Sequence, residues 1–221
     1  MILRHRPRAA HAVVLLLLTA SLITACTATG GHPTVGPSTA ASVAPSGSTA
    51  ADCPTSQPDA LGAGETRTVT IETDKGTITM SLKADLSPIA VGNFVALAAC
   101  GYYDGVVFHR IVPGFVIQGG DPTGTGTGGP GYTIADEAVT TEYHRGTVAM
   151  ARTSQPNSVG SQFFIVVDDG AQPALASANT YQIIGEVTSG METADAIFVA
   201  SGGQELPANP VAITTATVAN P

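Results

Sequence analysis

Residues 108–121 read FHRIVPGFVIQGGD and combine strand-like alternation with a single permanent cation, Arg110. An arginine keeps its charge at any physiological pH, so its place among apolar neighbours requires a physical reason. One interpretation is a guanidinium at the wall of an apolar pocket, directed at a ligand. The other is an arginine whose charged tip reaches water from a sheet edge. The spacing alone leaves both interpretations open.

Short apolar segments surround this stretch and predict strands. Residues 67–73 and 78–82 alternate on either side of a polar turn, which predicts a β-hairpin. The remaining predicted strands lie at 144–152, 162–167, 181–188 and 211–218. Because they are short and bounded by turn-forming residues, they indicate an antiparallel β domain.

Two segments carry a helical periodicity instead. Ser87 and Pro88 predict the N-cap and first turn of a helix that ends at Gly101. Ser189 and Glu192 form a capping-box pattern, which predicts the start of a second helix. Many short strands with only two helices favour a closed or sandwich-like antiparallel architecture.

The first 25 residues predict a signal peptide. Arginines precede an apolar run at 12–23 that is too short to span a bilayer. Small residues then lead directly into Cys26, a pattern that resembles the lipobox of bacterial lipoprotein precursors. The resemblance implies cleavage before Cys26, lipidation of its thiol, and an extracytoplasmic protein anchored to the bacterial cell membrane. An ordinary secretory signal with an incidental cysteine is the alternative.

Residues 26–64 follow the signal and consist mainly of Thr, Ser, Ala, Gly and Pro. They can bury too little apolar surface to offset the entropy of ordering, so we expect a flexible tether before one domain at 65–221. Once Cys26 is lipidated, Cys53 and Cys100 remain in an oxidising compartment. A disulfide between them and two free thiols are both compatible with the sequence.

The charge balance excludes some partners. The formal net charge is −8, and without the three N-terminal arginines six cations remain against 17 anions, which gives −11. Such a surface repels phosphate backbones and gains nothing from anionic lipid headgroups, so we expect no nucleic acid and membrane contact through the N-terminal lipid only. A domain with only His109 and His144, and no Cys-x-x-Cys spacing, predicts neither a metal site nor a cofactor.

A glycine-rich segment, GTGTGGPGY at 124–132, contains a formal G-x-G-x-x-G match. In a dinucleotide-binding fold a helix begins directly after such glycines. Here Pro130 and Gly131 stand at that position. The segment therefore predicts a loop.

Three motifs in register resemble the cyclophilin family of peptidyl-prolyl cis-trans isomerases. They are FHRIVPGFVIQGGD at 108–121, GTGTGGPGY at 124–132, and the pair MAR and GSQFFI at 150–152 and 160–165. The resemblance extends over roughly residues 66–218 in the family's order. It implies a closed eight-stranded antiparallel β-barrel capped by two α-helices.

The resemblance also implies a site. Arg110 is similar in position to the family's catalytic arginine. The substrate-binding residues implied by position are Phe115, Val116, Gln118, Ala151, Arg152, Phe164, Leu175, Tyr181 and Ile184. Because adjacent strand residues face opposite ways, Phe163 is assigned to the barrel core and Phe164 to the pocket.

The implied activity is isomerisation of X-Pro bonds in exported or cell-envelope proteins, which assists their folding; we expect a monomer. The alternative is a proline-peptide binding module or chaperone with incidental turnover. The chain departs from frequent family residues at Val116, which replaces a methionine, and at Arg152, which replaces an asparagine. Because the chain also has no tryptophan, cyclosporin sensitivity and peptide preference stay open.

Overall fold

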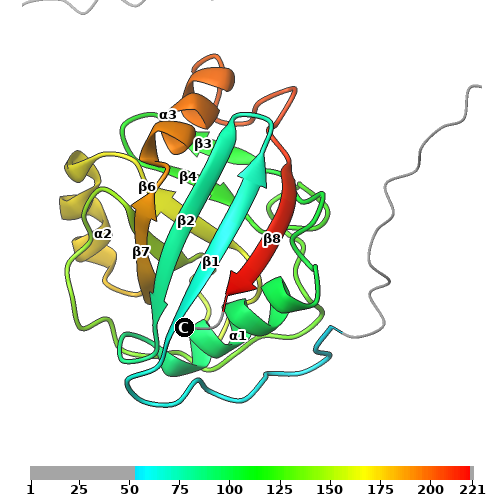
Figure 1. The fold of residues 1–221 in the computed structure, drawn as a ribbon. Helices are drawn as coiled ribbons and strands as arrows, with labels where there is room; N and C mark the ends of the chain where they lie inside the picture. The colour runs from blue at the N-terminus through cyan, green and yellow to red at the C-terminus, as the bar shows by residue number, and fades with distance from the viewer. Residues whose placement is uncertain (1–52, 220–221) are drawn as a thin grey trace, which may run out of the picture. The chain divides into compact units, whose positions relative to one another are not determined.

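The structure is a computed structural model that describes residues 53–219 (Figure 1). The predicted signal peptide, Cys26 and residues 26–52 of the predicted tether lie outside this range. No helix within 53–219 is both long and apolar enough to cross a membrane.

One sheet of eight antiparallel strands forms the domain. The strands are β1 (Thr66–Thr73), β2 (Gly76–Lys83), β3 (Arg110–Val112), β4 (Val116–Gly119), β5 (Thr147–Met150), β6 (Phe163–Val166), β7 (Ile183–Ser189) and β8 (Ile213–Ala219). Their order across the sheet is β3-β4-β6-β5-β7-β2-β1-β8. The predicted hairpin is confirmed as β1 and β2, whose pairing ends at Thr73 and Gly76.

The prediction of a closed barrel is wrong, because the sheet curls into a half-barrel whose edge strands, β3 and β8, do not pair. The segment before β3 is irregular and meets the segment before β8 at one isolated bridge, Val107 with Ala212. Single backbone hydrogen bonds, such as Phe108 N to Val211 O at 2.9 Å, add to this contact. The strand β3 itself has three residues, and all three pair with β4.

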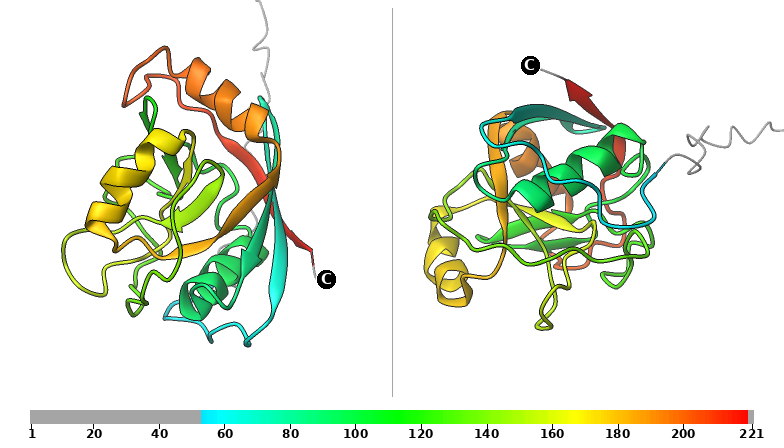
Figure 2. Two further views of the ribbon diagram at one scale, coloured as in Figure 1. Left: turned by 90° about the vertical axis from the view of Figure 1, so that its left-hand side faces the viewer. Right: turned by 90° about the horizontal axis from the view of Figure 1, so that it is seen from below.

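Within residues 53–219, three α-helices accompany the sheet, where the sequence predicted two. The helices α1 (Pro88–Ala99) and α3 (Met191–Ala200) lie at opposite ends of the curled sheet, and α2 (Gln172–Ala178) lies outside it beside β6 and β7 (Figure 2). A short 3₁₀ turn, Asp169–Ala171, precedes α2. The missed helix has seven residues, of which only Leu175 is buried, so it leaves almost no apolar periodicity in the sequence.

The helix ends differ in part from their predictions. Pro88 does begin α1, but the Ser87 side chain makes no capping hydrogen bond. The Glu137 carboxylate instead accepts the N–H groups of Ile89 and Ala90 at 2.8 and 2.9 Å, and the negative charge also suits a helix N-terminus. The capping box at Ser189 is wrong: α3 begins after Gly190, at a φ of 91° that favours glycine, and no side chain caps it.

The main core fills the inside of the curled sheet. Phe163 lies at its centre and contacts Phe94 of α1 edge-on, with ring centroids 5.1 Å apart. Tyr103 stacks on Phe94 at 4.9 Å. The sequence assignment of Phe163 to the core agrees with this packing.

A disulfide joins Cys53 to Cys100, so residues 53–64 are held against the domain. The Leu61 N–H donates to Pro88 O at 3.0 Å, and the side chain of Gln57 accepts the N–H of Ala135 at 2.9 Å. This part of the predicted tether is therefore packed on the start of α1 and on the loop after the glycine-rich segment.

Candidate active site

The strand register places the central residues in one row. Arg110 of β3 pairs with Gln118 of β4, which pairs with Phe164 of β6. The next residues along these strands, Ile111 and Ile117, are fully buried in the main core. Because side chains alternate along a strand, Arg110, Gln118 and Phe164 share the opposite, outer face of the sheet.

This outer face carries a second apolar cluster that forms the floor of a cavity. The cavity has a volume of about 250 Å³. It is lined by Arg110, Phe115, Val116, Gln118, Ala151, Arg152, Phe164, Leu175 and Tyr181. The ring of Tyr181 meets Phe164 edge-on, with centroids 5.4 Å apart. An apolar floor with a guanidinium and an amide at its rim can hold a small apolar ring and donate hydrogen bonds beside it.

Ile184 is the one implied site residue that does not line the cavity. It is fully buried in the main core, whereas its neighbour Ile183 belongs to the outer apolar cluster. The pairing of β5 with β7 shifts between Val148 and Ala149, which face Gly185 and Ile183 respectively. Ile184 is therefore the extra residue of a β-bulge, and it faces the core, opposite to Ile183.

Arg110 is held by two side chains. Its Nε donates to the Glu205 carboxylate at 2.8 Å, and one Nη donates to Gln118 Oε1 at 3.3 Å. Gln118 Nε2 in turn donates to Gln162 Oε1 at 2.9 Å. The guanidinium thus begins a hydrogen-bonded chain that reaches the glycine-rich loop, because Gln162 Nε2 donates to Gly126 O and Gly128 O. The contact between Arg110 and Glu205 was not predicted from the sequence.

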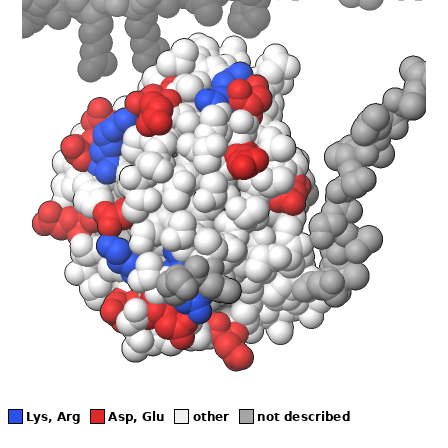
Figure 3. Space-filling view, in the orientation of Figure 1, with Lys and Arg blue, Asp and Glu red and all other residues white. Residues whose placement is uncertain are grey.

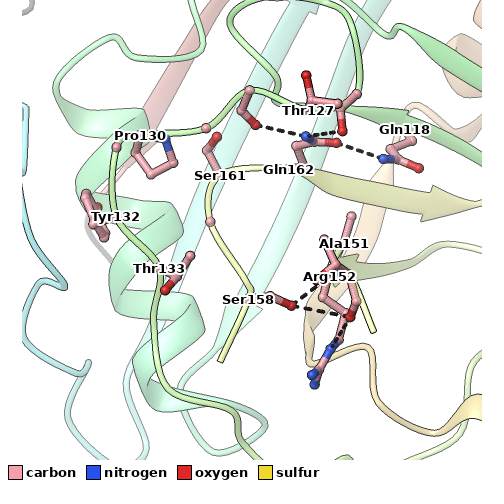
Figure 4. Close-up of a pocket in the computed structure, with 16 residues that line it drawn as sticks. Gln118, Thr127, Pro130, Tyr132, Thr133, Ala151, Arg152, Ser158, Ser161 and Gln162 are labelled. Carbon is pink, nitrogen blue, oxygen red and sulfur yellow. Dashed lines mark hydrogen bonds between the residues drawn. The ribbon is translucent and has the colours of Figure 1, made fainter. Parts of the chain in front are cut away.

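A second hollow of about 640 Å³ adjoins the cavity and shares Gln118, Ala151 and Arg152 with it (Figure 4). The glycine-rich loop and Tyr132 line one side, and Ser158 and residues 160–162 line another. Tyr132 donates to Asn93 Oδ1 at 2.8 Å, and Asn93 Nδ2 donates to Gly160 O at 2.8 Å. Both walls are therefore fixed to α1.

Arg152 lies where the two hollows meet, but its charged end is used within the protein. The guanidinium contacts the Asp136 carboxylate at 3.0 Å and donates to Thr153 O and Gln155 O at 3.1 and 2.7 Å. Its side chain is only 10% exposed. Arg152 therefore shapes the loop that follows it, and its stem supplies the wall of the site.

The glycine-rich segment is a loop, as predicted, and it surrounds a carboxylate of the protein itself. Asp121 is fully buried and accepts the N–H groups of Thr123, Gly126 and Gly128 at 2.7, 2.6 and 3.0 Å, together with the Thr123 hydroxyl. A Cβ at Gly128 would lie 2.0 Å from the carboxylate, so only glycine fits there. Burial alone would raise the pKa of Asp121, but these hydrogen bonds lower it to about 2.

Within residues 53–219, no three His, Cys, Asp or Glu side chains are grouped closely enough to hold a metal ion. Figure 3 shows acidic side chains outnumbering basic ones on the face that it draws, with broad uncharged areas between them.

Comparisons with known proteins all point to one family. Residues 68–218 match the family described as "Cyclophilin type peptidyl-prolyl cis-trans isomerase/CLD". A probable peptidyl-prolyl cis-trans isomerase A of Mycobacterium leprae is 41% identical over 68% of this chain and 91% of its own length. Peptidyl-prolyl cis-trans isomerase B of Bacillus subtilis is 46% identical over 55% of this chain and 82% of its own length.

A solved structure is also similar. It is a cyclophilin type peptidyl-prolyl cis-trans isomerase of Cryptosporidium parvum, determined in the presence of the dipeptide Ala-Pro. It has a TM-score of 0.63 and 37% identity, over 70% of this chain and 99% of that one.

Proposed function

The chain belongs to the cyclophilin-type peptidyl-prolyl cis-trans isomerases, and from this premise we propose that it acts on X-Pro bonds of exported and cell-envelope proteins and assists their folding. Without a catalyst, the cis and trans forms of these bonds interconvert over tens of seconds, which is slow enough to limit folding. The observation that carries the proposal is the row of Arg110, Gln118 and Phe164, which lines an apolar cavity.

The chemistry requires a donor that acts only on the twisted peptide bond. The barrier of about 18–20 kcal/mol arises because the amide nitrogen shares its lone pair with the carbonyl. When the bond twists, the prolyl nitrogen becomes pyramidal and can accept a hydrogen bond. We assign this donation to Arg110. Because the planar ground state offers no such acceptor, the bond stabilises the transition state selectively.

The remaining cavity residues hold the substrate in this account. Phe115, Val116 and Phe164 receive the proline ring, and Gln118 orients the peptide while it holds the guanidinium. Exclusion of water by these apolar walls strengthens the hydrogen bond from Arg110. The larger hollow receives the substrate residues next to the proline, since it shares Gln118, Ala151 and Arg152 with the cavity. No proton transfer, covalent intermediate or cofactor is needed.

A protease-coupled assay on an X-Pro peptide tests the enzymatic roles. Loss of one preorganised donor typically lowers kcat by about 10²–10³, and we expect an effect of this order for Arg110→Ala with little change in KM. Arg67→Ala, on the distant strand β1, is the control. An Arg110→Ala protein as active as the control would contradict the assignment.

Binding without turnover is the second candidate function. Two results together would support it: a proline peptide binds tightly, and the wild-type protein does not change the isomerisation rate. Titration of an Ala-Pro peptide and the same rate assay therefore separate the two functions on one sample.

Anchoring by a lipid on Cys26 remains part of the proposal, supported by the small residues that precede this cysteine. Metabolic lipid labelling and phase partitioning test it: a Cys26→Ala protein that still partitions with membranes would contradict it. We also propose a monomer, because Val199 and Leu206 are the only large apolar side chains that residues 53–219 expose. Light scattering measures this directly.

A further inference from the structure

Glu205 lies in the segment between α3 and β8 and carries the only carboxylate that contacts Arg110 within residues 53–219. Its Oε1 accepts the Nε–H of Arg110 at 2.8 Å. The other side of the guanidinium donates to Gln118 Oε1 at 3.3 Å. Both acceptors follow Arg110 in the chain: Gln118 is eight residues away, and Glu205 is 95 residues away.

We propose that Glu205 is a positioning residue for the catalytic arginine, which it orients through the hydrogen bond to Nε. This inference rests on the proposed role of Arg110. Glu205 itself touches neither the substrate nor the reacting bond in this account.

The need for such a residue follows from the side chain of arginine. Arg110 has several rotatable bonds, and its side chain is 37% exposed, so packing alone does not select one conformer. The guanidinium is planar, and its five N–H groups have fixed directions. Bonding Nε on one edge and Nη1 on another therefore fixes the plane. Within the described residues Nη2 donates to no other group, so its N–H groups remain available to a substrate.

The backbone around Glu205 is itself held in place. The N–H of Ile111, the residue after Arg110, donates to Glu205 O at 2.8 Å. The turn before it is formed by Gly202 and Gly203, both at positive φ, and by the Gln204 N–H, which donates to Ser201 O. Glu205 is thus attached to the same strand as the arginine that it orients, although they are far apart in sequence.

A simple surface ion pair is the competing explanation. The side chain of Glu205 is 55% exposed, and exposed pairs contribute little to stability. Both explanations therefore predict a small effect on unfolding. They differ in kinetics: a surface pair leaves kcat unchanged, whereas loss of a positioning contact lowers kcat. KM should stay constant, because the apolar cavity still binds the proline.

The test compares Glu205→Ala and Glu205→Gln with Glu192→Ala, a control at an exposed position of α3. In the protease-coupled assay we expect Glu205→Ala to lower kcat about tenfold, since small misplacements of catalytic groups cost one to two orders of magnitude, with KM changed less than twofold. Glutamine keeps an acceptor oxygen for Nε, so Glu205→Gln should retain at least a third of the wild-type kcat. An unchanged kcat in Glu205→Ala, or equal losses in both variants, would overturn the proposal.

An NMR measurement tests the contact without using activity. In the ¹⁵N-labelled protein, the Arg110 Nε–H signal, assigned by its loss in Arg110→Lys, should exchange slowly with water. In Glu205→Ala it should exchange at least tenfold faster, and in Glu192→Ala it should not change. A slowly exchanging signal in Glu205→Ala would overturn the proposal. If the wild-type protein has no isomerase activity, the proposed function fails, whereas this signal still reports whether Glu205 orients Arg110.

Discussion

Replacing Asp121 by asparagine should destabilise both the fold and the glycine-rich loop that lines the larger hollow. The carboxylate is fully buried and accepts three backbone N–H groups and one hydroxyl. Asparagine has almost the same shape, but one of its oxygens becomes an NH₂ group. That group would face N–H donors which already point at this position, so at least one buried donor loses its partner.

The size of the effect can be worked out from the pKa of Asp121. The pKa is about 2 in the folded protein, against an ordinary value of 3.8. At 1.36 kcal/mol per pKa unit, the ionised carboxylate contributes about 2 kcal/mol to the free energy of unfolding. Because the folded-state pKa is depressed, this contribution is present above pH 4 and is lost as the pH falls from about 4 to 2. An unpaired buried donor costs about 1–3 kcal/mol, which agrees in size.

Urea unfolding at pH 7 measures the change, with Asp74→Asn in the exposed turn of the β1–β2 hairpin as the control. We expect Asp121→Asn to lower the free energy of unfolding by about 2 kcal/mol and the control to leave it unchanged. The loop also lines the larger hollow, so kcat/KM should fall in conditions where the variant is fully folded. A variant that is as stable and as active as Asp74→Asn would refute the reasoning.

Three further predictions concern stability. Reducing the Cys53–Cys100 disulfide, whose cysteines are 47 residues apart, should lower the free energy of unfolding by about 4 kcal/mol, because the unfolded chain regains loop-closure entropy. Urea unfolding curves with and without reductant measure this change, and a loss below about 1 kcal/mol would contradict the prediction. Glu137→Ala should lower the free energy of unfolding by about 1–2 kcal/mol, because two N–H groups of α1 lose their acceptor. The control Glu142→Ala, at an exposed position, should leave it unchanged in the same urea experiment. Burial lowers the pKa of His109 below 6.5, although the charge of Asp121 opposes this shift. Below pH 6.5 the unfolded chain therefore binds a proton more readily than the folded chain, and the free energy of unfolding should fall from pH 7 to 5. An equal fall in His109→Gln would exclude this cause.

The local structure was predictable because it depends on neighbouring residues. Alternation predicted a strand at 67–73, and a short apolar run bounded by turn-forming residues predicted one at 162–167; the structure has them at Thr66–Thr73 and Phe163–Val166. The helix end at Gly101 was also predictable, since its φ of 76° requires a residue that tolerates a left-handed conformation. For α2, Asp168, Pro173 and the left-handed Asn179 are start and stop signals that could have revealed it.

Contacts between distant segments were not predictable in the same way. Nothing in the sequence near Ser87 indicates that Glu137, 48 residues beyond Ile89, accepts the first N–H groups of α1. The same holds for Glu205 and Arg110. The family resemblance supplied the residues of the cavity, but it also placed Ile184 there. Alternation from Tyr181 and Ile183, which belong to the outer cluster, turns Ile184 inward to the core.

The position of the site on the outer face follows from the same alternation that builds the core. Ile111, Ile117 and Ile165 turn inward and are fully buried, so Arg110, Gln118 and Phe164 must turn outward. An outward Phe164 would be exposed on a bare sheet, yet it is only 4% exposed, because Leu175 of α2 and Tyr181 pack beside it. The short helix therefore converts an apolar sheet face into a cavity. A closed barrel is not required for this, since β3, β4, β6 and α2 supply the row and its cover.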